Sequence, residues 1–169
     1  MQKKLCKKYF QLFFGELIAT ILFAFIWIEF IYMVDWGVIY LTSPYTISVF
    51  LVLEFILLQG TLYWYLKWKQ AKRNIFMSLA NHNLLIFLVC KRINVFLLAI
   101  GFLVLIYLIF SQSDYLYWYT FLYLFAAAEF INYYYYRLSY QTLSELKELF
   151  YLIRKRKLKP SKLSNELNR

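Results

Sequence analysis

Three glutamates lie within long apolar stretches of this 169-residue chain, and they are the residues best suited to chemistry: Glu16, Glu54 and Glu129. A carboxylate deep in a bilayer costs about 2.5 kcal/mol or more to insert, so such groups normally face a bundle interior or a watery cavity. Two amides accompany them. Gln59 follows Glu54 in the same stretch, and Asn132 lies three residues after Glu129, on the same helix face. We take these five residues as candidates for a site that binds protons or a cation.

The depth of each acid follows from the rise of a helix. At 1.5 Å per residue, Glu54 lies roughly 13 Å below the outer end of its stretch, Glu16 roughly 9 Å above the inner end of its own, and Glu129 roughly 10 to 12 Å above its inner end. We expect Glu16 and Glu129 to share a level, with Glu54 higher. Repulsion and desolvation then favour shared protons. A structural role also stays open, because membrane bundles use hydrogen-bonded polar groups between helices. Glu29, near the outer surface, better fits that structural role.

The elements that must position these acids are transmembrane helices. The chain is 63% hydrophobic with a mean hydropathy of +0.54, which is too apolar for a soluble domain of this size. About 20 apolar residues cross the hydrocarbon core as a helix. We predict an all-α integral membrane protein with a four-helix bundle over residues 1–140 and a cytoplasmic tail over 141–169. The four predicted spans cover about 10–34, 45–66, 93–110 and 115–136.

The connections and the tail carry weaker signals. Residues 35–44 and 111–114 are predicted to be short outer turns, and 74–92 to begin as an interfacial helix whose apolar second part can also belong to the third span. The tail begins with a capping box, Thr142 to Glu145, and continues as an amphipathic basic helix. We expect that helix to bind the membrane surface or a partner through Lys147, Arg154, Lys155, Arg156 and Lys157.

The distribution of basic residues predicts the orientation. All 19 Lys and Arg residues fall in segments 1–9, 67–73, 91–92 and 137–169, and the two predicted outer turns contain none. Basic residues near span ends stay on the cytoplasmic side. Both termini are therefore expected in the cytoplasm. The net charge of +10 is expected to face anionic lipid headgroups of the bilayer and not nucleic acid.

Several classes of site are excluded by what the sequence lacks. His82 is the only histidine, so a histidine-rich metal site is excluded, and Cys6 and Cys90 form no CxxC motif. The chain has no G-x-S-x-G, H-E-x-x-H or P-loop pattern. We therefore predict no catalytic residues, no metal and no cofactor. The run Tyr133 to Tyr136 is interpreted as an aromatic belt at the inner interface, and Ala126 to Ala128 as a packing surface.

Two segments carry a family resemblance: Gly15 to Lys69, with GELIATILFAF and YLTSPYTISVFLVLEFILLQGTLYWYLKWK, and Ala128 to Leu167, with AEFINYYYYRLSYQTLSELKELF and LKPSKLSNEL. Together they resemble small four-span proteins of low-GC Gram-positive bacteria that carry the label "general stress protein". The resemblance implies a bacterial plasma-membrane protein and brings no established activity. Gly15-Glu16 is also similar to the membrane glutamate of small multidrug-resistance transporters, although this chain is longer, has a basic tail and carries acids in two other spans.

Two functional hypotheses follow. The first is a non-enzymatic accessory or envelope-stress protein that acts on a membrane-protein partner or on anionic lipid through its tail and inner face. The second is a small proton-coupled transporter or channel component that uses Glu16, Glu54 and Glu129. A lipid-modifying enzyme is the least supported, since these acids lack a visible metal or nucleophile partner.

Overall fold

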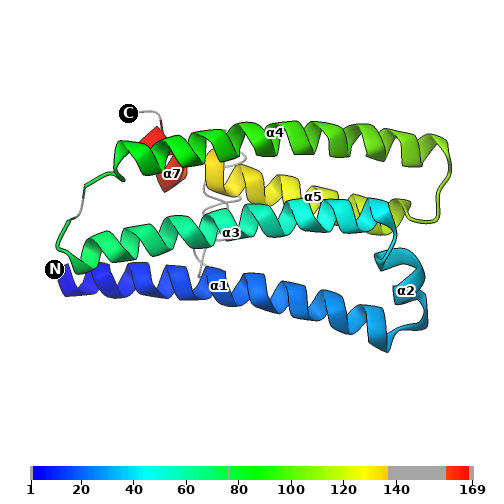
Figure 1. The fold of residues 1–169 in the computed structure, drawn as a ribbon, viewed down its shortest axis with the longest axis horizontal. Helices are drawn as coiled ribbons and strands as arrows, with labels where there is room; N and C mark the ends of the chain where they lie inside the picture. The colour runs from blue at the N-terminus through cyan, green and yellow to red at the C-terminus, as the bar shows by residue number, and fades with distance from the viewer. Residues whose placement is uncertain (1, 76, 137–158, 168–169) are drawn as a thin grey trace.

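The computed structural model describes residues 2–75, 77–136 and 159–167, and over these residues the protein is helical, without strands. Long helices lie side by side with alternating directions, and a short helix packs at the end of the bundle where the chain begins (Figure 1). The helices are α1 (Gln2–Met33), α2 (Asp35–Leu41), α3 (Pro44–Lys72), α4 (Asn81–Phe110), α5 (Leu116–Tyr134) and α7 (Lys162–Leu167).

Three of these helices, α1, α3 and α4, are long and apolar enough to cross a membrane. They contain the predicted spans 10–34 (all but its last residue), 45–66 and 93–110. The fourth predicted span, 115–136, forms α5, but this helix is shorter and rich in tyrosine, and it is not among the three. Large apolar side chains are exposed along α1 and α4, among them Phe14, Ile21, Phe25, Val95, Phe96 and Leu103. Such faces suit a lipid environment, because in water they would remain unburied.

Helix α3 lies at the centre of the bundle. It packs against α1, α4 and α5, and its Leu53 and Ile56 side chains are completely buried. Its start follows from the sequence: Pro44 stands at the first helical position, and the Ser43 hydroxyl accepts a hydrogen bond from the Thr46 amide at 3.2 Å. Its end also follows, because Asn74 adopts a left-handed conformation with φ of 59° just beyond Lys72.

Two predicted connections differ from the structure. Residues 35–44, predicted as a turn, include helix α2, which folds back so closely that a Cβ on Gly37 would lie 2.1 Å from the Phe30 carbonyl oxygen. The interfacial helix predicted from residue 74 is wrong for 74, 75 and 77–80, which are not helical. Side chains of α3 hold that backbone instead, since Lys67 Nζ donates to the Met77 carbonyl at 3.0 Å. The more apolar second part, from Asn81, is continuous with the third span in α4.

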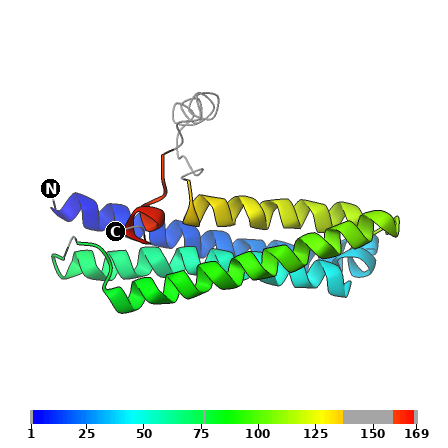
Figure 2. The same cartoon turned by 90° about the horizontal axis from the view of Figure 1, so that it is seen from above.

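The end of the bundle near the start of α1 has an unusual arrangement. Helix α5 ends at Tyr134, while α1, α3 and α4 extend further in the same direction (Figure 2). Helix α7 lies just past the end of α5 and contacts α4 and α5, with Leu163 only 3% exposed. The chain thus returns to the bundle at this end, which we name the inner end after the predicted orientation. Residues 137–158, which precede this return, contain the predicted capping box and most of the tail and lie outside the described part.

Candidate functional site

An acidic cavity of about 330 Å³ lies between α1 and α5, and Glu16 and Glu129 both line it. The two carboxylates come from different helices, and the depth estimates placed both carboxylates at a similar level. The remaining lining is uncharged and mostly apolar: Gln11, Leu12, Gly15, Ala19, Phe23, Leu57, Phe125 and Asn132. A space of this size can hold a small ligand, and two carboxylates select for a proton or a cation.

Tyr133 connects the two helices that supply the carboxylates of this site, α1 and α5. Its hydroxyl donates a hydrogen bond to Glu16 Oε2, although Tyr133 belongs to α5 and Glu16 to α1. The ring passes Gly60 of α3, where a Cβ would lie 2.3 Å from the Tyr133 Cζ atom. The absence of a side chain at Gly60 therefore makes room for the ring. Thr20 adds a polar contact between α1 and α3, since its hydroxyl lies 3.5 Å from that of Thr61.

Glu129 has a different partner. Asn132 Nδ2 donates to Glu129 Oε2 at 3.1 Å, which is the same-face pairing expected from their spacing of three residues. Within the part of the chain that the structure describes, each carboxylate thus receives a neutral hydrogen bond, and no lysine or arginine lines the cavity. Neutral donors lower the cost of a buried negative charge without cancelling it. A proton or a bound cation is needed to neutralise the pair.

Glu54 stands apart from this pair. It does not line the acidic cavity, and its Oε1 atom is buried without a hydrogen-bond partner among the described residues. Glu29, the outermost acid of α1, also lies away from the cavity lining. Of the five candidate residues, only three line the acidic cavity: Glu16, Glu129 and Asn132.

Gln59, the fifth candidate, belongs to a separate buried network. Its amide pairs reciprocally with that of Asn94 in α4: Gln59 Nε2 donates to Asn94 Oδ1 at 3.2 Å, and Asn94 Nδ2 donates to Gln59 Oε1 at 2.7 Å. The Tyr134 hydroxyl donates to the same Gln59 Oε1 at 2.6 Å. All three side chains are buried, so this network joins α3, α4 and α5 through hydrogen-bonded polar groups.

The interpretation of residues 133 to 136 as an interface belt is wrong for the first two. Tyr133 and Tyr134 are 7% and 0% exposed, whereas Tyr135 and Tyr136 are 39% and 43% exposed. Spacing gives a signal for Tyr133, which lies four residues after Glu129 and so on its helix face. Asn94 was also missed, although an amide in an otherwise apolar span is itself a signal for a buried partner.

A second polar cluster lies at the inner end of the bundle. Glu166 of α7 forms an ion pair with Lys67 of α3, and both side chains are largely buried, at 13% and 7% exposed. Glu166 also accepts hydrogen bonds from the Tyr63 hydroxyl at 3.3 Å and from the Leu79 amide at 3.0 Å. Every bond to this carboxylate comes from a different donor group, which is how a buried charge is stabilised.

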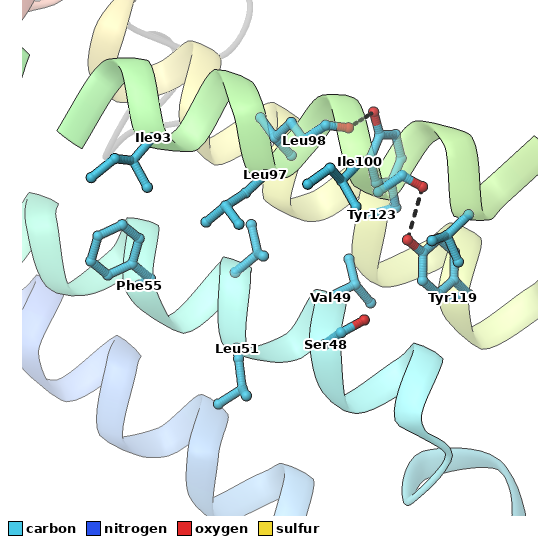
Figure 3. A pocket seen from close by; sticks show the side chains of 13 residues that line it. Ser48, Val49, Leu51, Phe55, Ile93, Leu97, Leu98, Ile100, Tyr119 and Tyr123 are labelled. Atoms are coloured by element: carbon cyan, nitrogen blue, oxygen red, sulfur yellow. Dashed lines mark hydrogen bonds between the residues drawn. The ribbon is translucent and has the colours of Figure 1, made fainter. Parts of the chain in front are cut away.

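An apolar cavity of about 470 Å³ lies between α3, α4 and α5 on the other side of the central helix (Figure 3). Its polar groups are already used: the Tyr119 hydroxyl donates to the Gly101 carbonyl at 2.8 Å and the Tyr123 hydroxyl to the Leu98 carbonyl at 3.1 Å. A Cβ on Gly101 would lie 3.1 Å from the Tyr123 ring, so Gly101 allows these rings to approach α4. Among the described residues that line this cavity, no unpaired polar group points to a ligand.

The basic tail residues Lys147, Arg154, Lys155, Arg156 and Lys157 lie outside the described residues. Within the described ranges, no three His, Cys, Asp or Glu residues form a group that could hold a metal ion. No family model, curated protein or solved structure matches the chain. The function is therefore argued from the residues themselves.

Proposed function

We propose that this protein binds a monovalent cation in its acidic cavity in exchange for a proton, as a small transporter or channel component. The observation that carries the proposal is that Glu16 and Glu129, from two different helices, line one cavity, with no basic residue among the described residues of its lining. Two negative charges in that space repel each other, so one carboxylate holds a proton when the cavity is empty. A cation that enters replaces the proton and keeps the charge of the site constant.

The proposed setting is the bacterial plasma membrane, with four spans and both termini in the cytoplasm. Helix α5 has 19 residues, about 28 Å of helix, which is close to the ~30 Å of the hydrocarbon core. This length supports α5 as the fourth span despite its tyrosines. Exposed basic residues gather in the helix segments at one end, including Lys3, Lys7, Lys69 and Arg73, and support a cytoplasmic inner end.

The exchange can be tested by proton release from the purified, detergent-solubilised protein. We expect tetraethylammonium chloride, added to a weakly buffered sample, to release up to one proton per protein, beyond the response of the double variant Glu16→Gln/Glu129→Gln to the same addition. Glu16→Gln and Glu129→Gln should each reduce this release while the protein stays folded. Glu29→Gln is the matched control, because Glu29 is in α1 but outside the cavity, and it should retain the release. A release that persists in the double variant Glu16→Gln/Glu129→Gln would reject the proposal.

A second candidate function is an accessory protein that binds anionic lipid or a membrane-protein partner through its inner face. The exposed lysines of the first turns of α1, such as Lys3, Lys4, Lys7 and Lys8, favour it. Of the predicted tail over 141–169, residues 159–161 are not helical and α7 packs on the bundle, so they do not belong to a basic surface helix. The surface would be extended instead by Lys147, Arg154, Lys155, Arg156 and Lys157. Their joint replacement by glutamine, which keeps α7 in the chain, should weaken binding to vesicles that contain phosphatidylglycerol, relative to neutral vesicles. Unchanged binding after that replacement would count against the tail.

A further inference from the structure

The last turn of α5 carries Tyr133, and the returning C-terminal segment holds this turn in place. Ser161 donates a hydrogen bond from its hydroxyl to the Tyr133 carbonyl, and its amide donates to the Tyr135 carbonyl at 2.9 Å. Pro160 pairs with Tyr136 as an isolated antiparallel bridge. The last carbonyls of a helix have no partner within the helix, so these bonds complete the end of α5.

Ser161 also fixes the start of α7. Its hydroxyl oxygen accepts a hydrogen bond from the Ser164 amide at 3.0 Å, as a helix-capping serine does. One buried hydroxyl, 6% exposed as a residue, thus joins the end of α5 to the start of α7. Any displacement of α7 must therefore act on the Tyr133 backbone.

The other end of α7 is held by the buried ion pair between Glu166 and Lys67. Tyr63, one turn before Lys67 in α3, and the Leu79 amide complete the bonds to this carboxylate. Loss of one member of a buried pair leaves the other charge uncompensated, which is strongly unfavourable. The ion pair therefore helps to hold α7 against the bundle, together with the buried Leu163 side chain.

We propose that the C-terminal segment 159–167 is a positioning element for the acidic cavity. Through Ser161 it orients Tyr133 toward Glu16, and the ion pair of Glu166 with Lys67 keeps it in that place. The chain of contacts runs from Lys67 and Glu166 through α7 and Ser161 to Tyr133 and then to Glu16. This inference rests on the proposed cation exchange for its readout of binding, but the contacts themselves can be tested without it.

The first measurement is the affinity of the full-length protein for tetraethylammonium, determined from the proton release. Glu166→Gln should weaken the affinity by about tenfold, which corresponds to ~1.4 kcal/mol. The same substitution in a Tyr133→Phe background should change the affinity much less, because the hydroxyl that α7 positions is already absent. Asn165→Ala, at an exposed position of the same helix, is the control and should leave the affinity unchanged.

Equal weakening by Glu166→Gln in both backgrounds, or no weakening in either, would overturn the proposal. Because Glu166→Gln can impair folding, a second variant replaces the pair by apolar side chains, Lys67→Met/Glu166→Leu, and should restore most of the affinity by keeping α7 docked. Failure of this double variant to restore affinity while it remains folded would also overturn it.

A stability measurement separates this proposal from the exchange function. If the wild-type protein releases no proton, the exchange is rejected, and the thermal midpoints of Glu166→Gln, Tyr133→Phe and their combination still test the positioning. We expect the combined shift to be smaller than the sum of the two single shifts. Additive shifts would show that α7 and Tyr133 are independent and would reject the positioning role.

Discussion

The Tyr133 hydroxyl donates a hydrogen bond to the Glu16 carboxylate, and the ring reaches it across Gly60 of the central helix. Three helices therefore meet at one contact, with the donor from α5, the acceptor from α1 and the space from α3. This contact sets the direction of the Glu16 carboxylate at the acidic cavity. It also makes the effect of small substitutions at Gly60 predictable.

Gly60→Ala should destabilise the protein, because the new methyl group would lie 2.3 Å from the Tyr133 Cζ atom. Forcing an extra carbon into a packed core typically costs about 1 to 3 kcal/mol, and here it also displaces the hydroxyl from Glu16. The measurement is the free energy of unfolding in detergent micelles. Gly15→Ala is the matched control: its Cβ has no neighbour within 4 Å, so we expect no loss of stability there. A loss of equal size at both positions would contradict the packing argument.

Tyr133→Phe keeps the ring and removes only the hydroxyl. We expect a loss of about 1 kcal/mol in stability, because interhelical hydrogen bonds in membrane proteins contribute about that much. The Glu16 carboxylate would then lose its donor from α5, so the affinity for the probe cation should change as well. Tyr117→Phe serves as the control, since Tyr117 is 83% exposed. An unaltered affinity in Tyr133→Phe would mean that the hydroxyl does not orient Glu16.

The Gln59–Asn94 amide pair should behave as a unit. Asn94→Leu leaves the buried Gln59 amide without its partner, and Gln59→Leu does the same to Asn94, so each single variant should lose about 1 to 3 kcal/mol. The double variant should lose less than the sum, because neither amide is then left without the other, and only the Tyr134 hydroxyl remains without its acceptor. Unfolding free energies of the four proteins give the coupling, and a coupling near zero would show that the pair does not stabilise the bundle.

Glu54 should not behave like the two cavity acids. Its Oε1 atom is buried and has no hydrogen-bond partner in the described part of the chain. Because a buried polar atom without a partner is unfavourable, Glu54→Met should leave stability unchanged or raise it. Proton release on cation addition should also persist in this variant. Loss of proton release in a folded Glu54→Met protein would show that Glu54 takes part in the exchange.

Sequence patterns predicted the elements well where hydrophobic length decides the structure. The stretches 45–66 and 93–110 lie in α3 and α4, because about 20 apolar residues have few alternatives to a helix. Depth along each helix also placed Glu16 and Glu129 at a similar level. Convergence on one cavity could not be predicted, because it depends on how α1 and α5 rotate about their axes, which hydropathy does not report.

The contacts that segment 159–167 makes where it packs on the bundle were not predictable from local sequence patterns. Glu166 lies 99 positions from Lys67, and nothing near either residue identifies the other as its partner. The tail was predicted to bind the membrane surface through its basic residues, and that part lies outside the described residues. The place of α7 follows instead from the short length of α5, which leaves room at the inner end for Leu163 and Glu166.

The exchange of a cation for a proton predicts a specific dependence of affinity on pH. Protons compete with the cation for the carboxylates, so the affinity for tetraethylammonium should fall as the pH falls, by about tenfold per pH unit where one proton is exchanged. Among the described residues, the ionisable groups facing Glu16 are Glu129 across the cavity and the Tyr133 hydroxyl, and the other side chains of the lining carry no ionisable group. Substitution of one acid should therefore flatten the dependence.

Isothermal titration at several pH values measures that slope. Glu129→Gln leaves a single carboxylate, which can stay ionised alone or bind a proton, so both the affinity and its slope should decrease. Glu29→Gln, outside the cavity, should keep the slope of the wild type. An affinity that does not vary with pH in the wild type would mean that no proton leaves when the cation binds. In that case Glu16 and Glu129 act as hydrogen-bonded contacts between helices, and the exposed basic inner face becomes the better guide to function.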